Sequence, residues 1–282
     1  MEAQAIDKTQ ALFNRLEGGL AQLLESGDWK NYLLTQSKFH RYSFRNILLV
    51  LFQKPNASRL AGYRTWQELG RQVKKGEKAI QILAPLKRKL EQVNEQGETE
   101  IDYAIAGFKT VSVFDVSQTE GDEIPEIASC LSGDDGGLIQ YLVDFSDNNR
   151  VPVRFEGALG ANGVCRFRDG KAFEIIVDPL LSKLHQSKTL THEIAHSLLH
   201  GSEKYQGHSN TSLAELEAES VAYIVTQHFG LDTSSYSFSY IAGWQKDEDA
   251  LENLKESGTR IQHTALQIID WVENQAIELI SD

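Results

Sequence analysis

Cysteine is nearly absent from this chain, with two residues in 282. Cys130 and Cys165 are too few for a disulfide framework, and neither has the spacing of a metal-ligand pair. No apolar run approaches the roughly 18 residues that a membrane-spanning helix needs. The chain also does not start with a basic segment followed by an apolar one, so we expect no secretory signal peptide. These absences predict a cytoplasmic protein with no membrane partner.

Acidic residues are scarce between residues 30 and 89, where 14 basic residues accompany only Glu68 and Glu77. Residues 1–118 contain 17 basic and 13 acidic residues, a net charge of +4. Residues 119–282 contain 11 basic and 27 acidic residues, a net charge of -16. Such an asymmetry predicts two domains with different partners.

His192, Glu193 and His196 form the pattern H-E-x-x-H. Residues four apart on a helix lie on the same face, so both imidazoles can bind one zinc ion while Glu193 faces a zinc-bound water. The apolar residues around them predict a helix that is buried on its other side. The alternative is a core helix whose histidines only form hydrogen bonds.

Two further carboxylates lie in a helical run that extends to Val225. Glu215 and Glu219 are four residues apart, so one can complete the metal shell while the other orients a ligand histidine. Two histidines and one glutamate leave the fourth position of zinc open for water, as in catalytic sites. The pattern therefore predicts one zinc ion per chain.

The pattern H-E-x-x-H followed by E-x-x-x-E resembles the gluzincin metallopeptidases, and HEIAHSLLH is similar to the ImmA/IrrE branch of small zincins. The resemblance implies that Glu215 is the third zinc ligand and that Glu219 supports the metal ligands from outside the shell. It also implies that Glu193 is the general base of a peptidase with an unknown substrate. Glu217 matches neither carboxylate position and is expected to face solvent.

Several nearby side chains have other roles in this hypothesis. His200 lies one helical turn beyond His196, too far for the same ion, and we interpret it as structural. His208 is a weaker rival ligand. Candidates for stabilising an oxyanion are Tyr205, His208 and Tyr240, with no ranking among them.

Aromatic residues are interleaved with the cations of the basic stretch. This combination is typical of proteins that bind single-stranded DNA, where cations contact phosphates and rings stack on unpaired bases. The alternative is a solvated basic face over an ordinary aromatic core, in which case alanine at Tyr42 or Trp66 would unfold the domain. The candidate DNA-binding residues are Arg41, Tyr42, Arg45, Trp66, Arg71, Lys74, Lys75 and Lys78.

Four segments of this half, in order, resemble the N-terminal single-stranded-DNA-binding domain of ArdC-type antirestriction proteins. They are Phe39 to Asn46, Gln53 to Ala57, Trp66 to Lys78 and Val113 to Thr119. A similar domain occurs in plasmid primases of the TraC type. The resemblance covers about residues 25–120 and implies a protein that protects incoming mobile-element DNA, as in plasmid conjugation. Two alternatives remain: a regulatory zinc endopeptidase that cleaves a repressor-like partner, and a non-catalytic DNA-binding module with a structural zinc.

The predicted fold class is α+β with two domains. A helical and antiparallel-strand DNA-binding domain covers residues 1–120, a linker covers 121–137, and a gluzincin-like zincin domain covers 138–282. The expected helices cover about residues 4–26, 43–52, 138–145 and 246–279, with a short helix that has Thr65 as its N-cap. The expected strands cover residues 79–86, 101–116, 151–155, 164–168 and 172–177, the last two forming a hairpin around Asp169-Gly170.

Overall fold

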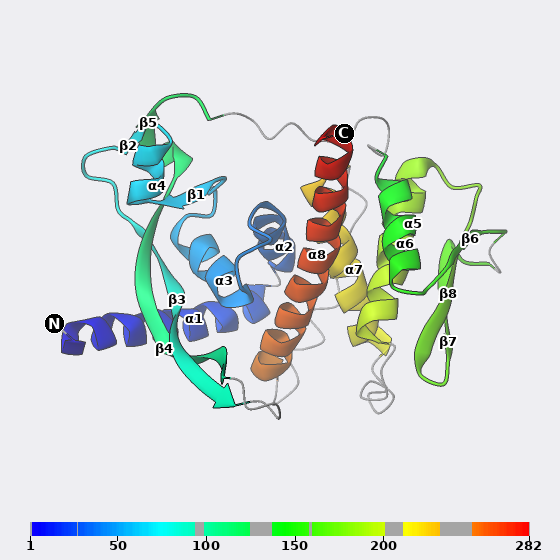
Figure 1. The fold of residues 1–282 in the computed structure, drawn as a ribbon, viewed down its shortest axis with the longest axis horizontal. Helices are drawn as coiled ribbons and strands as arrows, with labels where there is room; N and C mark the ends of the chain where they lie inside the picture. The colour runs from blue at the N-terminus through cyan, green and yellow to red at the C-terminus, as the bar shows by residue number, and fades with distance from the viewer. Residues whose placement is uncertain are drawn as a thin grey trace. The chain divides into compact units, whose positions relative to one another are not determined.

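The structure is a computed structural model that describes residues 2–26, 28–93, 99–124, 137–157, 160–200, 211–231 and 250–281. The chain divides into two compact units. Unit 1 contains Met1–Gln22 and Arg45–Ile124, and unit 2 contains Leu23–Phe44 and Pro125–Asp282. Both contain helices and strands, so the predicted α+β class is confirmed (Figure 1). Within the described ranges, no helix combines the length and the hydropathy that crossing a bilayer requires.

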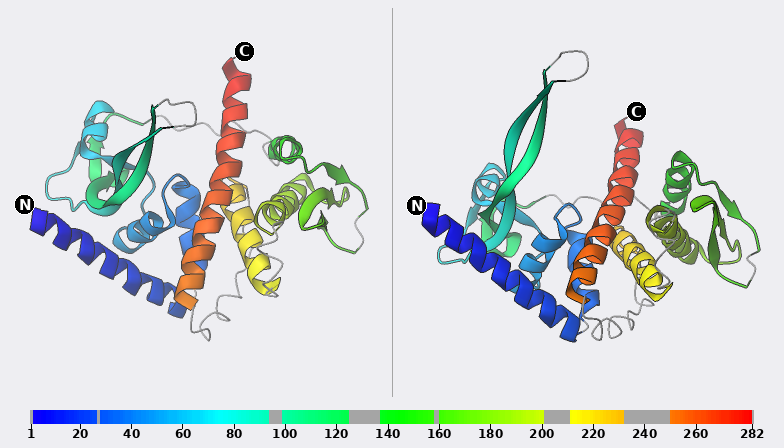
Figure 2. Two further views of the ribbon diagram at one scale, coloured as in Figure 1. Left: turned by 60° about the horizontal axis from the view of Figure 1, so that its bottom comes forward. Right: turned by 90° about the horizontal axis from the view of Figure 1, so that it is seen from below.

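A long antiparallel hairpin is the main feature of unit 1 (Figure 2). Its strands β3 (Ile80–Val93) and β4 (Thr99–Asp115) pair along their length, and the short β1 (Leu60–Gly62) pairs with the other edge of β4. The first strand was expected to cover residues 79–86, but it continues to Val93. The strand continues because its residues beyond Leu86 pair with β4, from Lys87 with Ile105 to Val93 with Thr99.

Helix α3 (Phe44–Gln53) covers the free edge of β3 with two amide side chains. Asn46 bonds both the N–H and the carbonyl of Leu83, each at 2.9 Å. Gln53 does the same with Gln81, at 2.9 and 2.8 Å. These bonds satisfy backbone groups that an edge strand would otherwise expose.

Helix α1 (Glu2–Ser26) approaches α3 closely through a glycine. A Cβ at Gly19 would lie 1.9 Å from the Phe52 ring, so a larger residue would displace that ring. Helix α4 (Tyr63–Glu68) begins directly after β1, with Gly62 as its N-cap. The expectation that Thr65 caps this helix was wrong, because the chain turns from strand to helix three residues earlier.

A buried carboxylate closes the base of the hairpin. Asp115, which is fully buried, accepts hydrogen bonds from the backbone N–H groups of Ser58, Arg59 and Ser117 at 2.7, 3.1 and 3.0 Å. It also caps the short helix η1 (Val116–Gln118). That helix leads into β5 (Thr119–Gly121), which pairs with β2 (Arg71–Val73). Burial alone would raise the pKa of Asp115, but these hydrogen bonds hold it below its usual value.

Asp115→Ala should lower the free energy of unfolding of unit 1 by about 3 kcal/mol, because it leaves buried N–H donors without an acceptor. Denaturant unfolding of the full chain, followed by tryptophan fluorescence, measures this change. Glu120→Ala is the control, since Glu120 is an exposed neighbour. Equal stability of the two variants would contradict the role assigned to Asp115.

Unit 2 is layered, with a small sheet on one side and helices on the other (Figure 1). The sheet has the order β6-β8-β7, in which β6 is parallel to β8 and β7 is antiparallel to it. Helix α6 packs on this sheet and on α7, which in turn packs on α8 and α2. The elements are α2 (Trp29–Lys38), α5 (Leu138–Asn148), β6 (Val153–Phe155), β7 (Gly163–Arg168), β8 (Lys171–Val177), α6 (Lys183–Leu199), α7 (Thr211–His228) and α8 (Ala250–Ser281).

Helix α2 was not expected from the sequence, and it belongs to unit 2. Trp29 and Tyr32 are fully buried and stack on each other, with ring centroids 4.6 Å apart. The Trp29 indole donates a hydrogen bond to Ser220 of α7 at 2.9 Å. The aromatic residues near the start of the basic stretch are therefore core residues of unit 2. The unit division differs here from the expected domain of residues 1–120.

Candidate metal centre

The H-E-x-x-H residues lie in the second half of helix α6. Ser182 caps the helix by accepting a hydrogen bond from the His185 N–H at 3.3 Å. Leu190, Ile194 and Ala195 are buried and fix the rotation of the helix. The histidines one turn apart therefore emerge on the face that lies beside β7 and α7.

Three ligand atoms form a compact triangle at this face. His192 Nε2 lies 3.0 Å from His196 Nε2 and 3.3 Å from Glu215 Oε2, and His196 Nε2 lies 3.5 Å from Glu215 Oε1. Tetrahedral coordination with metal–ligand bonds of about 2.0–2.2 Å separates ligand atoms by roughly 3.3 Å. The side chains present therefore fit one divalent metal ion.

Each ligand histidine has a partner at its other ring nitrogen. Glu219 Oε2 lies 3.2 Å from His192 Nδ1, where it accepts a hydrogen bond and directs Nε2 to the triangle. His196 Nδ1 lies 2.8 Å from His200 Nδ1. His200 thus fixes the ring of His196, a more specific role than the structural one expected for it.

The partner of His200 is Glu217, which was expected to face solvent. That expectation was wrong: Glu217 is fully buried, and its Oε2 lies 3.2 Å from His200 Nε2. Arg260 of α8 donates to Oε1 from its Nε at 3.1 Å. Burial alone would raise the pKa of Glu217, but the hydrogen bonds from His200 and Arg260 lower it to about 2.

The sequence contained one signal for this chain of contacts. His200 follows His196 by four residues, which places both rings on one helix face. No sequence signal linked either residue to Arg260, which lies on another helix. Glu217 lies between Glu215 and Glu219 in the sequence. Without knowledge that α8 packs there, the helical pattern predicts that its side chain is exposed.

Glu193 lies beside the triangle under strand β7. A Cβ at Gly163 would lie 2.5 Å from Thr189 Cγ2 and 3.2 Å from Glu193 Oε1, so this strand residue has to be small. Burial raises the pKa of Glu193 above its usual value, although the His192 charge and the Cys165 backbone N–H partly oppose it. A carboxylate with a raised pKa is suited to accept and release a proton near neutral pH.

The pKa values of the two ligand histidines are shifted in opposite directions. Burial would lower the pKa of His192, but hydrogen bonds to Glu215 and Glu219 raise it to about 9. Burial and then the charge of His192 lower the pKa of His196 to about 4. The positive charge of His192 therefore lies at the position where a metal cation would bind, and the cation would replace it.

A cleft of about 630 Å³ opens over the triangle. Asn162 and residues 163–165 of β7 form one wall of the cleft. Helix α6, together with Glu215 and Glu219 of α7, forms the other. Cys165 also lines it, and burial, with the Glu193 charge, raises the pKa of this thiol to about 12. The thiol is therefore neutral and a poor nucleophile. Tyr205, His208 and Tyr240 lie outside the described residues.

The structure separates the candidate DNA-binding residues. Arg41 and Tyr42 lie in unit 2 and the other six in unit 1. Arg41 bonds Asp270 and Glu273 of α8 at 3.3 and 3.1 Å, and Tyr42 is half-buried against Phe39.

Three of the six candidates in unit 1 have structural contacts, and one of them, Lys74, donates from its Nζ to the Ser117 carbonyl at 3.1 Å. Trp66 is 2% exposed, and its indole donates to the Phe114 carbonyl at 2.9 Å, so it is a core residue and cannot stack on a base. Arg71 donates to Thr119 Oγ1 at 2.8 Å and to backbone carbonyls near β5. The exposed candidates are Arg45, Lys74, Lys75 and Lys78.

Comparison with known proteins matches both halves of the chain. Residues 5–114 match the model of the N-terminal domain of anti-restriction factor ArdC. An uncharacterized protein of Bacillus anthracis is 27% identical over 86% of this chain and 47% of its own length. The chain thus spans about half the length of that relative.

Two crystal structures are similar to this chain. The metal-free antirestriction ArdC protein from the R388 plasmid is 21% identical, covers 84% of this chain and 86% of its own, and gives a TM-score of 0.50. Its Mn(II)-bound structure is 18% identical, covers 83% and 89%, and gives a TM-score of 0.46. The first of these similarities establishes a shared fold.

Proposed function

We propose, on the premise that residues 5–114 belong to the family of ArdC N-terminal domains, that this chain is an antirestriction protein with two activities. Unit 1 binds single-stranded DNA, and unit 2 hydrolyses peptide bonds at a zinc centre. The observation that carries the second activity is the triangle of His192, His196 and Glu215 atoms, 3.0–3.5 Å apart, with Glu193 beside it.

Glu193 is the proton carrier of the proposed reaction. A zinc ion held by the triangle would supply a Lewis acid for water and for a peptide carbonyl. Glu193 accepts the proton of the attacking water and delivers it to the leaving amine. Glu219 and His200 keep the two imidazoles oriented, so their Nε2 atoms stay in place throughout.

Strand β7 indicates the form of the substrate. It pairs only with β8 among the described strands, and its residues 163–165 line the cleft. An extended peptide can bind such an edge through backbone hydrogen bonds, which would place its carbonyls over the triangle. This favours a polypeptide substrate and also supports the second candidate, a regulatory endopeptidase that cleaves a repressor-like partner. A purely structural zinc is disfavoured because structural sites usually have four protein ligands.

For DNA, the outer hairpin of unit 1 offers a suitable face. Lys87 pairs with Ile105 and Lys89 with Tyr103, so these four side chains share one face of the arm. Tyr103 is 60% exposed and lies among the cations of β3. This combination provides a ring for base stacking next to cations for phosphates.

A second basic feature of unit 1 lies at the turn before β3. A cavity of about 510 Å³ there includes Arg15, Lys54 and Lys78 in its lining, with Glu77 as its acidic member. Gln118 donates to Glu77 at 2.9 Å, which holds that carboxylate at one side. We place phosphate contacts in this cavity and on the adjacent Lys75.

Tyr103→Ala should weaken single-strand binding about tenfold, because stacking contributes about 1–3 kcal/mol per base. Lys87→Ala should reduce the salt dependence of binding by about one released ion. Fluorescence polarisation with a labelled oligonucleotide at several salt concentrations measures both. Phe155→Ala, an exposed aromatic of unit 2, is the control. Unchanged affinity in Tyr103→Ala would exclude this face.

The whole proposal is tested by a restriction-protection assay on incoming DNA with the wild type, Tyr103→Ala and Glu193→Gln. Protection by the wild type is expected, and its absence would contradict the antirestriction function. Loss of protection in Glu193→Gln alone would link protection to hydrolysis. Loss of protection in Tyr103→Ala alone would mean that protection depends on DNA binding. Hydrolysis would then belong to the second candidate function, the cleavage of a repressor-like partner.

A further inference from the structure

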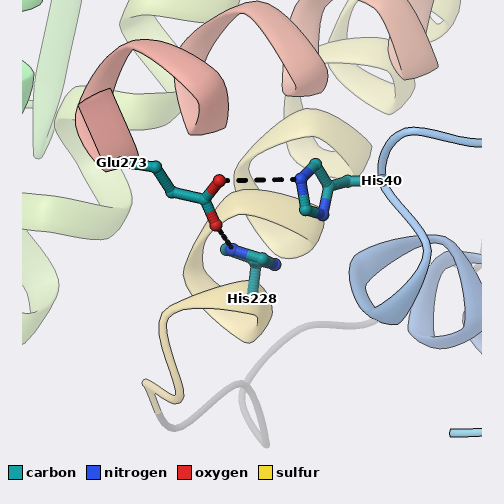
Figure 3. Close-up of side chains that lie close together, drawn as sticks. All are labelled: His40, His228 and Glu273. Carbon is teal, nitrogen blue, oxygen red and sulfur yellow. Dashed lines mark hydrogen bonds and ion pairs between the residues drawn. The ribbon is translucent and has the colours of Figure 1, made fainter. Parts of the chain in front are cut away.

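Unit 2 contains a second cluster of potential metal ligands, formed by His40, His228 and Glu273 (Figure 3). His40 follows α2, His228 is the last residue of α7, and Glu273 lies on α8. One ligand atom from each lies within 4.8 Å of the others. Glu215 and His228 are separated along α7 by roughly 20 Å, so this cluster is distinct from the candidate metal centre.

The hydrogen bonds of His228 define which ring nitrogen can bind a cation. Its Nδ1 lies 3.0 Å from the Ser37 carbonyl, which can only accept, so Nδ1 carries a hydrogen. Its Nε2 lies 2.9 Å from Glu273 Oε1. In a neutral ring, Nε2 would direct a lone pair at a carboxylate, so this contact requires either a second proton on the ring or a cation.

His40 presents a buried ring with unused nitrogens. Within the described part of the chain, neither its Nδ1 nor its Nε2 has a hydrogen-bond partner, although both atoms are buried. Its Nε2 lies 3.9 Å from Glu273 Oε2 and 3.9 Å from Asp270 Oδ1, beyond hydrogen-bond distance. Leaving such an atom unsatisfied costs about 1–3 kcal/mol, and a metal ion would remove that cost.

We propose that His40, His228 and Glu273 form a second metal site, which takes a divalent transition-metal ion such as zinc. Two imidazoles and a carboxylate are ligands that zinc prefers, at separations of roughly 3.3 Å in a tetrahedral shell. The separation of His228 Nε2 and Glu273 Oε1 is 2.9 Å, and one ligand atom from each of the three residues lies within 4.8 Å of the others, so side-chain rotations can close the shell. Asp270, one turn before Glu273 on α8, has its Oδ1 3.9 Å from His40 Nε2 and can supply the fourth protein ligand that structural sites usually have.

Among the residues that the structure describes, Arg41 is the one Lys or Arg with a contact at this site. Its Nη2 lies 3.1 Å from Glu273 Oε2 and 3.3 Å from Asp270 Oδ1. The guanidinium therefore holds Oε2, and Oε1 is the oxygen that faces His228 and the metal. Since the Arg41 side chain is 67% exposed, solvent screens its repulsion of a bound cation.

The site would join three parts of unit 2 that are distant in sequence. Residue 40 comes from the early chain, and residue 273 lies near its end. A bound ion would clamp the segment after α2 to α7 and α8, so metal binding would contribute to the stability of unit 2. The role we assign is structural and does not depend on hydrolysis at the other centre.

Zinc content of the chelator-stripped, zinc-reloaded full chain tests the second site. The wild type should hold two ions, Glu215→Ala one, His40→Ala one, and Glu215→Ala with His40→Ala none. His263→Ala, an exposed histidine of α8, is the control and should match the wild type. A His40→Ala variant that binds as many ions as the wild type would overturn the proposal. If the candidate metal centre binds nothing, His40→Ala should still bind one ion fewer than the wild type.

A melting experiment covers the case in which His40→Ala does not fold. In the Glu215→Ala variant, saturating zinc should raise the melting temperature, because an ion that binds only the folded state stabilises it. Cobalt(II) in the same variant should give the visible absorption of a tetrahedral ion. In this experiment His40, His228 and Glu273 are unchanged. The absence of both the thermal shift and the cobalt band would overturn the second site.

Discussion

Glu193→Gln is expected to lower peptide hydrolysis by at least about a hundredfold while the protein keeps its metal. Glutamine preserves the size of the side chain but cannot accept a proton. The triangle of His192, His196 and Glu215 remains complete, so metal content should not change. Cleavage of a casein or peptide-library substrate, followed by mass spectrometry and paired with elemental analysis, measures both quantities.

Cys165→Ala is the informative contrast for this prediction. Cys165 lines the same cleft, but its thiol stays neutral because burial raises its pKa to about 12. We therefore expect this variant to retain hydrolysis. Loss of hydrolysis in Cys165→Ala but not in Glu193→Gln would replace the metallopeptidase hypothesis with thiol chemistry.

Local patterns predicted the parts of the fold that local physics determines. The helix over residues 4–26, the helix over 43–52 and the hairpin around Asp169-Gly170 are confirmed, because each depends on periodicity or turn residues within its own segment. Asp169 and Gly170 both have positive φ, as a tight hairpin turn requires. The resemblance to ArdC-type proteins is confirmed by the family match over residues 5–114.

Properties that depend on distant packing could not be predicted in this way. Trp66 lies in a segment rich in cations, yet its ring fills the core of unit 1. Arg41 bonds carboxylates that follow it by more than two hundred residues. A charge pattern gives the composition of a surface, but only the fold decides which members of the pattern reach solvent.

The same limit applied to the candidate metal centre. His192, His196 and Glu215 were expected to hold one ion, with Glu219 outside the shell, and the structure brings ligand atoms of the first three together. Whether they bind zinc stays a prediction. The residues that orient the ligands, His200 and Glu217, depend on Arg260 of α8. No sequence pattern specified how α8 packs against α7, and for this reason Glu217 was wrongly expected to face solvent.

Glu217→Ala should destabilise unit 2 by about 3–5 kcal/mol, the cost of leaving a buried ion pair without one partner. Glu217 is fully buried and accepts hydrogen bonds from both His200 and Arg260. Its loss also frees His200, and through it the ring of His196, so metal affinity should fall about 10–100-fold. Denaturant unfolding of the metal-free chain and competitive zinc titration measure the two effects separately.

Glu256→Ala provides a matched control, because Glu256 is a second carboxylate that forms an ion pair with Arg260. Its side chain is 61% exposed and lies 3.6 Å from Arg260 Nη1, so its removal should change the free energy of unfolding by less than about 1 kcal/mol. The ion pair described for Glu256 is with Arg260, so zinc affinity should stay at the wild-type value. A Glu217→Ala variant that binds zinc as tightly as Glu256→Ala would mean that His200 does not orient His196. Reduced zinc affinity with unchanged stability would instead mean that Glu217 acts on the metal ligands and is not needed to balance Arg260.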